Sequence, residues 1–208
     1  MTRPSLIAAA AVAVFLFAAA GLWLHAAWDK RAQQKRIAEL VHDTTEELRR
    51  GLAPQAPPSV VARIDENLQA ARAPRDPQLA EAASLYILGA REIVRRRVEA
   101  ERLEREAAAS RAALAAHMAS GRRNDAWFRG ALELKQRVER EHRDLEFTLK
   151  ALDELLYTLP ETERDLAPHV TPAALFEESE RRQARERLEL EARRATAALE
   201  KARGLAVR

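Results

Sequence analysis

The feature that most constrains this chain is its apolar N-terminus. Between Pro4 and Trp28 there is no formally charged side chain. At ~1.5 Å per residue, the almost wholly apolar run from Leu6 to Trp28 reaches ~35 Å as a helix, enough to cross a ~30 Å hydrocarbon core. Residues 1–28 are therefore predicted to form a transmembrane anchor. Its large apolar side chains are Leu6, Phe15, Leu16, Phe17, Leu22, Trp23, Leu24 and Trp28.

The end of this apolar run supports insertion in a membrane. Trp23 and Trp28 lie where aromatic rings prefer the headgroup layer, and Asp29 ends the run. A cleaved signal peptide is the alternative, with 6–17 as its apolar region and the small residues at 18–20 as its cleavage site. Cleavage there would leave an apolar new N-terminus, so a retained span is the preferred interpretation.

Two arguments about membrane orientation disagree. Lys30, Arg31, Lys35 and Arg36 follow the span, whereas only Arg3 and the α-amine precede it, which favours a cytoplasmic C-terminus. A short basic tail before one apolar stretch is also typical of a signal anchor, and long domains translocate largely regardless of charge. Arginine greatly outnumbers lysine and alanine is abundant, which indicates a GC-rich bacterial genome. We expect a single-pass protein of the cell inner membrane whose bulk is periplasmic, with the cytoplasmic orientation as the alternative.

Composition favours an all-α fold beyond the anchor. Charged residues make up 32% of the chain and aromatic residues 5%, so a core must be built mainly from Leu, Ala, Val and Ile. The expected fold is a single transmembrane helix followed by a long antiparallel helical hairpin or coiled-coil-like bundle. The lack of cysteine excludes disulfides and thiolate metal sites. Because the arginines at 95–97 are closely followed by glutamates that can pair with them, no nucleic-acid partner is expected.

Helix-breaking residues divide the chain beyond the anchor. A membrane-proximal helix is expected at 29–50 before Gly51, and a stiff proline-rich linker at 51–59. Asp76 and Thr171, each followed by proline, are helix start signals, and Ser120 to Asp125 is predicted to be the turn of the hairpin. The region 60–208 is therefore expected to be a hairpin or bundle with helices at about 60–72, 77–119, 126–159 and 172–203.

The predicted helix at 126–159 carries a heptad repeat. Five apolar residues take the a positions, Trp127 and two leucines take d positions, and the polar Glu141 and Thr148 fill the other d positions. Antiparallel pairing with the preceding helix would bury this stripe. The predicted helix-pairing residues are Leu134, Val138, Leu145, Leu152, Leu155 and Leu159.

Two glutamate–histidine pairs are the only candidates for metal chemistry. Glu39 with His42 and Glu139 with His142 have the three-residue spacing that di-iron helical bundles use twice. The heptad places Glu139 at position b, away from the seam, so ordinary surface residues are the preferred interpretation. The sequence has no phosphate-binding glycine loop and no nucleophile elbow, so neither a cofactor nor catalysis is expected.

These observations predict a membrane-anchored helical interaction or scaffold protein of the bacterial cell envelope. Its expected partners are the lipid bilayer and another helical envelope protein or a second copy of this chain. One alternative is a sensor-like bundle that binds a small ligand near Tyr86, Trp127 and Tyr157. The other is a bundle that binds a metal through carboxylates and histidines, which is the only enzyme-like option.

Overall fold

The computed structural model describes the backbone of residues 3–73, 76–120 and 124–206, and the side chains of these residues except 3–22, 26 and 205–206. Over this part of the chain the protein is all-helical. Its elements are α1 (Arg3–Leu52), α2 (Ser59–Ala71), α3 (Pro77–Ala119), α4 (Asp125–Arg164), the short 3₁₀ turn η1 (Pro172–Ala174) and α5 (Glu178–Ala206).

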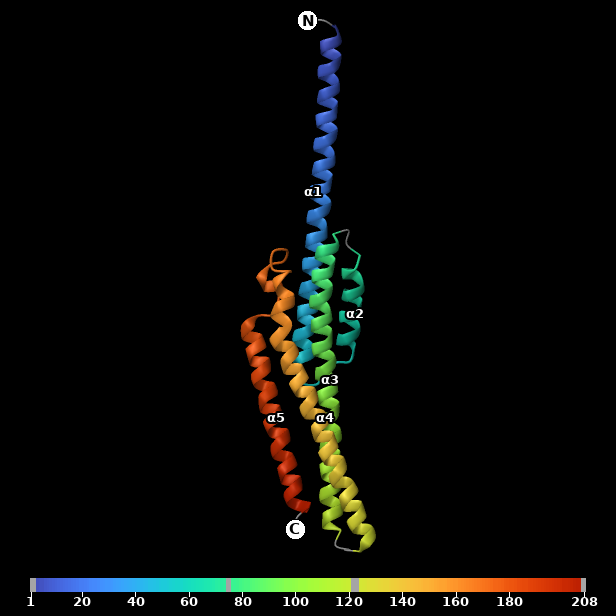
Figure 1. Cartoon of the computed structure of the whole chain (residues 1–208), viewed down its shortest axis with the longest axis vertical. Coiled ribbons are helices and arrows are strands. Elements are labelled where there is room, and N and C mark those ends of the chain that lie inside the picture. Colours follow the sequence, from blue (N-terminus) through green and yellow to red (C-terminus); the bar gives the residue numbers. More distant parts are fainter. Residues whose placement is uncertain (1–2, 74–75, 121–123, 207–208) are drawn as a thin grey trace.

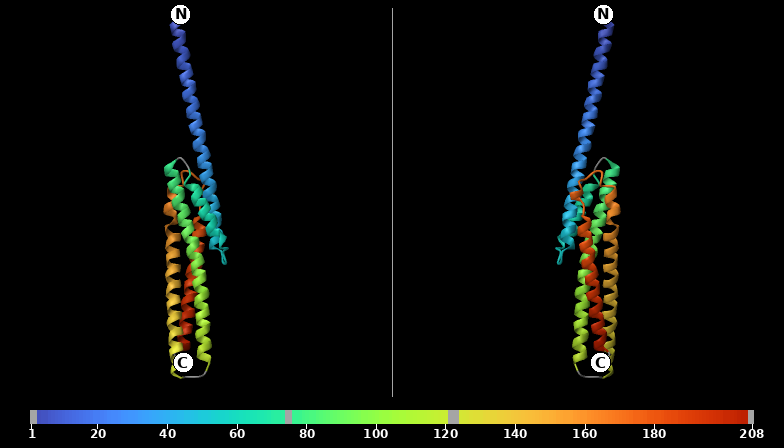
Figure 2. Two further views of the ribbon diagram at one scale, coloured as in Figure 1. Left: turned by 90° about the vertical axis from the view of Figure 1, so that its right-hand side faces the viewer. Right: turned by 90° about the vertical axis from the view of Figure 1, so that its left-hand side faces the viewer.

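The helices form one elongated bundle from which α1 projects (Figure 1). The first part of α1 extends beyond the other helices, and its last part lies against α2 and α3. α3 and α4 form a long antiparallel hairpin whose turn lies at the end far from the N-terminus, and α5 runs beside α4 (Figures 1 and 2). We call this end distal. The bundle therefore changes along its length, because α1 and α2 reach only its upper half.

Local capping explains where the hairpin helices begin. Asp76 has an extended backbone and its side chain accepts hydrogen bonds from the N–H groups of Gln78 and Leu79, both at 3.2 Å, with Pro77 at the first helical position. Asn124 caps α4 by accepting from Trp127 N at 2.8 Å. Such caps satisfy N–H groups that have no partner inside the helix. Gly121, the predicted helix stop, lies outside the described residues.

The hydrophobic core has two parts. A large cluster joins all five helices in the upper and middle bundle, and it includes the fully buried Tyr86, Ile87 and Leu152. A small distal cluster contains Leu114, Val138, Leu199 and Ala202. His142, only 5% exposed, lies on α4 between Val138 of the small cluster and Leu145 of the large one. The distal third of the bundle therefore has much less apolar contact than the rest.

The buried face of α4 differs from the predicted heptad at one position. Val138, Leu145, Leu152 and Leu159 are buried, but the second core position is occupied by His142, Leu149, Leu156 and Glu163. Leu134 and Leu155 are only partly buried. Trp127 and Thr148, at predicted d positions, are also buried, and Leu134 and Leu155 pack against the two core clusters. The buried face is therefore wider than the predicted seam, and residues four after each a position share it. Leu149 and Leu156 then extend one apolar stripe without a break.

Two predicted helix ends differ from the structure. α4 does not end at Leu159 but continues through Pro160 to Arg164. A proline inside a helix costs ~3 kcal/mol, and the burial of Glu163 and Leu166 beyond it holds this last turn against the bundle. The last helix does not start at Pro172, where only η1 forms, but at Glu178. The chain is extended at Leu175, with Ala174 and Phe176 buried on either side.

The predicted transmembrane anchor lies largely outside the described side chains. Leu6, Phe15, Leu16, Phe17 and Leu22 are among the residues whose side chains are not described. Trp23, Leu24 and Trp28 are 72%, 53% and 73% exposed on the projecting part of α1. Within the described part of the chain, no helix is both long and apolar enough to span a bilayer.

Candidate functional site

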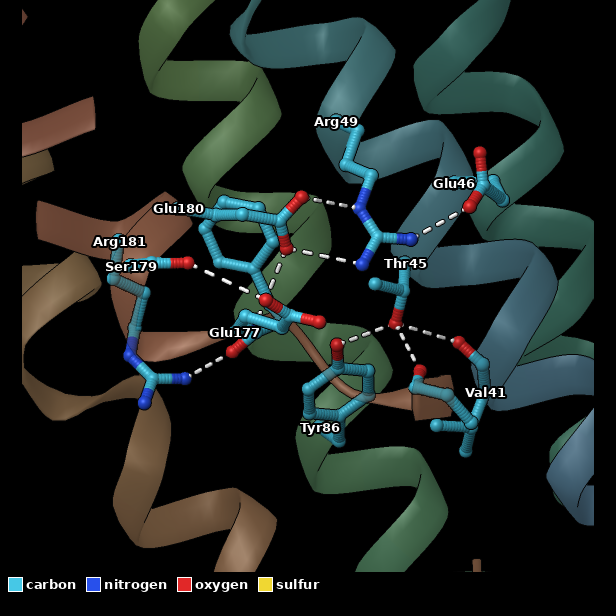
Figure 3. Close-up of polar contacts among 11 residues, drawn as sticks. Val41, Thr45, Glu46, Arg49, Tyr86, Glu177, Ser179, Glu180 and Arg181 are labelled. Atoms are coloured by element: carbon cyan, nitrogen blue, oxygen red, sulfur yellow. Dashed lines mark hydrogen bonds and ion pairs between the residues drawn. The ribbon is translucent and has the colours of Figure 1, made fainter. Parts of the chain in front are cut away.

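The junction between α1 and the bundle is built around one buried hydroxyl. Thr45 is fully buried, and its Oγ1 lies 2.6 Å from Tyr86 Oη, 2.7 Å from Ala174 O and 2.9 Å from Val41 O (Figure 3). Carbonyls can only accept, so Thr45 directs its one proton toward Val41 O and Ala174 O, and Tyr86 donates to Thr45. Burial raises the pKa of Tyr86, which keeps its phenol a donor. α1, α3 and the α4–α5 connection therefore meet at one point.

Two arginine–carboxylate pairs lie beside this hydroxyl network. Arg49 of α1 donates to both carboxylate oxygens of Glu180 on α5, at 2.8 and 3.0 Å, and to Glu46 at 2.6 Å. Arg181 donates to both oxygens of Glu163 on α4 at 2.9 Å and also contacts Phe176 O. Figure 3 shows the Arg49 pair next to Thr45 and Tyr86. We call these five groups, Thr45, Arg49, Tyr86, Ala174 O and Glu180, the α1 clasp.

The sequence contains a signal for the clasp. Val41 and Leu48 are buried on one face of α1, and Thr45 lies four residues after the first and three before the second. Residues at these spacings share a helix face, so a threonine there is placed in the core. The partner atom, the carbonyl of Ala174, is 129 residues away and no local pattern indicates it.

The ion pair of the clasp predicts a dependence of stability on pH. The hydrogen bond from Arg49 holds the pKa of Glu180 below its usual value. A carboxylate with a lowered folded-state pKa stabilises the fold above its unfolded pKa, and this contribution is lost as the pH falls through the folded-state pKa. Between pH 5 and 3, the wild-type chain should lose ~1 kcal/mol more stability than E180Q, a small value because the pair is partly exposed.

Urea unfolding of both proteins at several pH values would test this expectation. Burial raises the pKa of Glu163, so this group acts in the opposite direction and gains a proton at higher pH. Glu163 is present in both proteins, so its effect cancels in the difference. Equal acid sensitivity of wild type and E180Q would contradict the assigned role of the Arg49–Glu180 pair.

Two grooves flank α5. The first lies between the outer faces of α4 and α5 and is lined mainly by charged side chains, with Tyr157 as its exposed aromatic residue. Arg185 binds Asp153 through two hydrogen bonds of 2.7 and 3.0 Å and stacks 5.3 Å from the Tyr157 ring centroid. The Arg185–Asp153 pair thus joins α5 to α4 across this groove.

The second groove lies below the α1–α2 turn, between α3 and α5. Leu145 and Leu149 of α4 form its floor, Ala100, Ala195 and Ala198 line its walls, and Pro54, Ala56 and Pro58 close its upper end. Leu145 and Leu149 are only 2% and 5% exposed, so the alanines and prolines line the open space and the leucines lie beneath it. We call this cavity the distal groove.

The hairpin tip is held by a histidine–tryptophan pair. The rings of His117 and Trp127 stack at 5.3 Å, and Trp127 Nε1 donates to His117 O at 3.0 Å. His117 Nε2 lies 2.9 Å from Trp127 O, which can only accept, so this ring nitrogen carries a proton. Trp127 is buried, as its heptad position indicated, whereas Phe128 is 57% exposed. The tip thus combines a rigid turn with one exposed aromatic ring.

The structure does not bring the predicted metal residues together. Glu39 and His42 are exposed on α1, and Glu39 lies 3.9 Å from Lys35. Glu139 lies 3.4 Å from Arg203, and His142 is not a surface residue but is buried 3.9 Å from Glu146. No cluster of three metal-binding side chains occurs among the described residues.

The three aromatic residues of the sensor hypothesis also lie apart. Tyr86 is fully buried in the α1 clasp, Trp127 is at the hairpin tip, and Tyr157 is 69% exposed on the α4–α5 groove. They do not line one cavity. Sequence reasoning missed the distal groove, whose α3 and α5 walls combine three alanines with six charged side chains and carry no single sequence signal.

Comparison with protein families, with curated proteins and with solved structures finds no match to this chain. The geometry of the α1 clasp and the surfaces that the bundle exposes are therefore the evidence on its function.

Proposed function

We propose that this chain is a membrane-anchored helical spacer and interaction protein of the bacterial cell envelope, without catalytic activity. Its first helix would hold it in the inner membrane as a single span, and its bundle would present helix faces to another helical envelope protein. The bulk is assigned to the periplasm, with the cytoplasmic orientation as the outcome that a topology test distinguishes.

One observation carries this proposal: α1 is a single helix of 50 residues that begins in the apolar N-terminal segment and ends inside the bundle. No proline occurs between Pro4 and Pro54, so nothing in the chain sequence introduces a proline kink between the segment and the bundle. The α1 clasp then fixes the last turns of this helix to α3 and α5. The bundle would be held at a defined angle and height rather than on a flexible tether.

The dimensions suit a spacer. From Trp28 to Gly51, α1 rises ~35 Å, and α3 continues for nearly 40 Å from Val94 beside Gly51 to the hairpin tip. The tip would therefore lie ~70 Å from the membrane surface. The outward face of α4 carries four exposed apolar side chains over this length: Phe128, Leu132, Phe147 and Tyr157.

A dual topology reporter after Arg208 tests the anchor and its orientation. Phosphatase activity in the membrane fraction is the expected result, because the enzyme works only outside the cytoplasm. Fluorescence of the paired fluorescent protein at the membrane would assign the bundle to the cytoplasm. Either reporter in the soluble fraction would remove the anchor from the proposal.

In-cell photo-crosslinking tests the interaction role. A benzoylphenylalanine at Leu132 or Phe147, on the exposed face of α4, should give a discrete larger adduct, whereas the same group at Gln69 of α2 serves as an exposed control. A partner or a second copy captured at the α4 positions alone is the expected result. No adduct at any position on α4 or α5 would contradict an interaction protein.

A further inference from the structure

The distal groove continues the path that α1 follows along α3. α1 and α3 run in the same direction, with Thr45 beside Tyr86 and Gly51 beside Val94 (Figure 1). Beyond Gly51 the chain turns away into α2, while α3 and α5 continue. Val98, Glu101 and Arg105, the next residues of α3 on this path, line the distal groove instead of contacting α1. The groove is thus the lower half of a helix-binding position whose upper half α1 fills.

The upper half shows how a helix fits this position. α1 buries Leu48 toward the core and pairs a charge at its edge with α5, through Arg49 and Glu180. A helix in the lower half would likewise place apolar side chains over Leu145 and Leu149, between the alanine walls. Small residues on the walls allow such a helix to approach closely, as helix packing distances of 8–10 Å require.

Three arginines and three glutamates line the distal groove, so their formal charges cancel, but they are unequally paired. Each of its three glutamates already pairs with an arginine: Glu191 and Glu101 with Arg97 at 2.5 and 3.4 Å, and Glu104 with Arg111 at 2.9 Å. In contrast, Arg105 and Arg194 line the groove and have no carboxylate partner among the described residues. Arg187, two helical turns before Arg194 on α5, is likewise unpaired within the described chain and lines the cavity that continues the groove toward α1.

The roof of the groove is held in an unusual conformation. Gln55 has a φ of 60°, the left-handed region that non-glycine residues seldom adopt, and its N–H donates to Glu101 at 3.2 Å. The turn is thereby fixed directly above the groove, and Glu101 is occupied both by this bond and by Arg97. The acidic groups of the groove are therefore bound within the protein, as is Arg97. Arg105 Nε donates to Glu101 O at 3.2 Å, which leaves the other N–H groups of Arg105 and those of Arg194 to face an occupant.

We propose that the distal groove binds an acidic amphipathic helix of a partner protein, about three turns long. Its apolar face would lie between the alanine walls above Leu145 and Leu149, and its carboxylates would bind Arg105 and Arg194 of the groove and Arg187 of the adjoining cavity. This inference rests on the proposed interaction function and names the chemistry of the partner. A membrane lipid is a poor candidate, because the groove lies ~35 Å beyond Trp28 and a headgroup charge is screened within ~10 Å. A second copy would offer helix faces that mix both signs of charge, so it matches the three arginines less well.

Fluorescence anisotropy with three labelled helical peptides tests the assignment. The peptides share one stripe of leucine and alanine and differ only in their flanking residues, which are glutamate, glutamine or lysine. The full chain would be held in nanodiscs of phosphatidylcholine, with empty nanodiscs as the blank. We expect the glutamate peptide to bind at least 10-fold more tightly than the lysine peptide, with the difference shrinking at 0.5 M salt.

Two variants locate the binding in the groove. Ala198→Trp fills the cavity and should weaken the glutamate peptide at least 10-fold. The pair R105Q and R194Q should weaken the glutamate peptide ~5–10-fold and leave the glutamine peptide unchanged. The matched control is the pair R140Q and R143Q on the exposed face of α4, which removes the same charge and should have no effect.

Several results would overturn the inference. These are equal binding of the glutamate and lysine peptides, no binding of any peptide, or equal effects of the groove and control pairs. A dimer in sedimentation that Ala198→Trp dissociates would reassign the groove to self-association. Failure here with a partner still captured on α4 would reject the groove alone, because the crosslinking positions lie on another face.

Discussion

Replacement of Tyr86 by alanine is expected to lower the free energy of unfolding by ~3–5 kcal/mol. Tyr86 is fully buried in the large core cluster, so its removal leaves a cavity that the surrounding helices can fill only in part. It also leaves Thr45 without its 2.6 Å hydrogen bond. Urea unfolding of the full chain in mild detergent, followed by far-UV circular dichroism, would measure the loss.

The chain supplies its own control for this experiment. Tyr157, the other tyrosine, is 69% exposed, so Y157A should cost less than ~1 kcal/mol through its contact with Arg185. Y86F keeps the ring and removes only the hydroxyl, so it should cost ~1–2 kcal/mol. Equal effects of Y86A and Y157A would show that the α1 clasp does not stabilise the bundle.

Replacement of Gly51 by alanine should also destabilise the bundle, by ~1–3 kcal/mol, although alanine is the better helix former. A Cβ on Gly51 would lie 2.4 Å from Cγ2 and 2.7 Å from Cγ1 of Val94. Val94 is fully buried and β-branched, so it cannot turn aside without strain. α1 would have to move away from α3 at the point where the chain turns into α2.

A second substitution can separate this clash from other effects of the mutation. V94A alone removes buried methyl groups and should be destabilising, but in G51A/V94A the added methyl occupies the space that valine leaves. The double variant should therefore be more stable than the sum of the single effects by more than ~1 kcal/mol. G204A, where an added Cβ meets nothing within 4 Å, is the control and should not lower stability. Additive effects of G51A and V94A would rule out the clash.

The sequence predicts well those features of this bundle that depend on neighbouring residues. Asp76 followed by Pro77 places the start of α3, and its range is the predicted 77–119. The all-helical class follows from composition and from the 3–4 spacing of apolar residues. The end of α4 was not predicted. Pro160 alone indicates that the helix ends there, but the burial of Glu163 beside Arg181 extends the helix to Arg164.

Features that depend on distant residues could not be predicted. Thr171 and Pro172 form a start signal, but only the 3₁₀ turn η1 forms there, Ala174 O accepts from Thr45, and the α-helix begins at Glu178. The distal groove likewise arises because α1 ends at Leu52 while α3 and α5 continue, a relation among three separated segments. Arg105 and Arg194 line the groove without a carboxylate partner in the described chain because each neighbouring glutamate pairs with another arginine, which no local pattern indicates.

The α1 clasp has a consequence for the order in which this protein is made. Thr45 cannot form its hydrogen bond to Ala174 O until Ala174, 129 residues further along the chain, has been synthesised. At ~5–20 residues per second, the ribosome needs roughly 6–25 s to add those residues. During this interval the first helix has already left the ribosome, and α2 and α3 can join it, but the last contact around Thr45 is still missing. α1 is therefore the first helix to be synthesised, and the α1 clasp is completed only after the α4–α5 connection has been made.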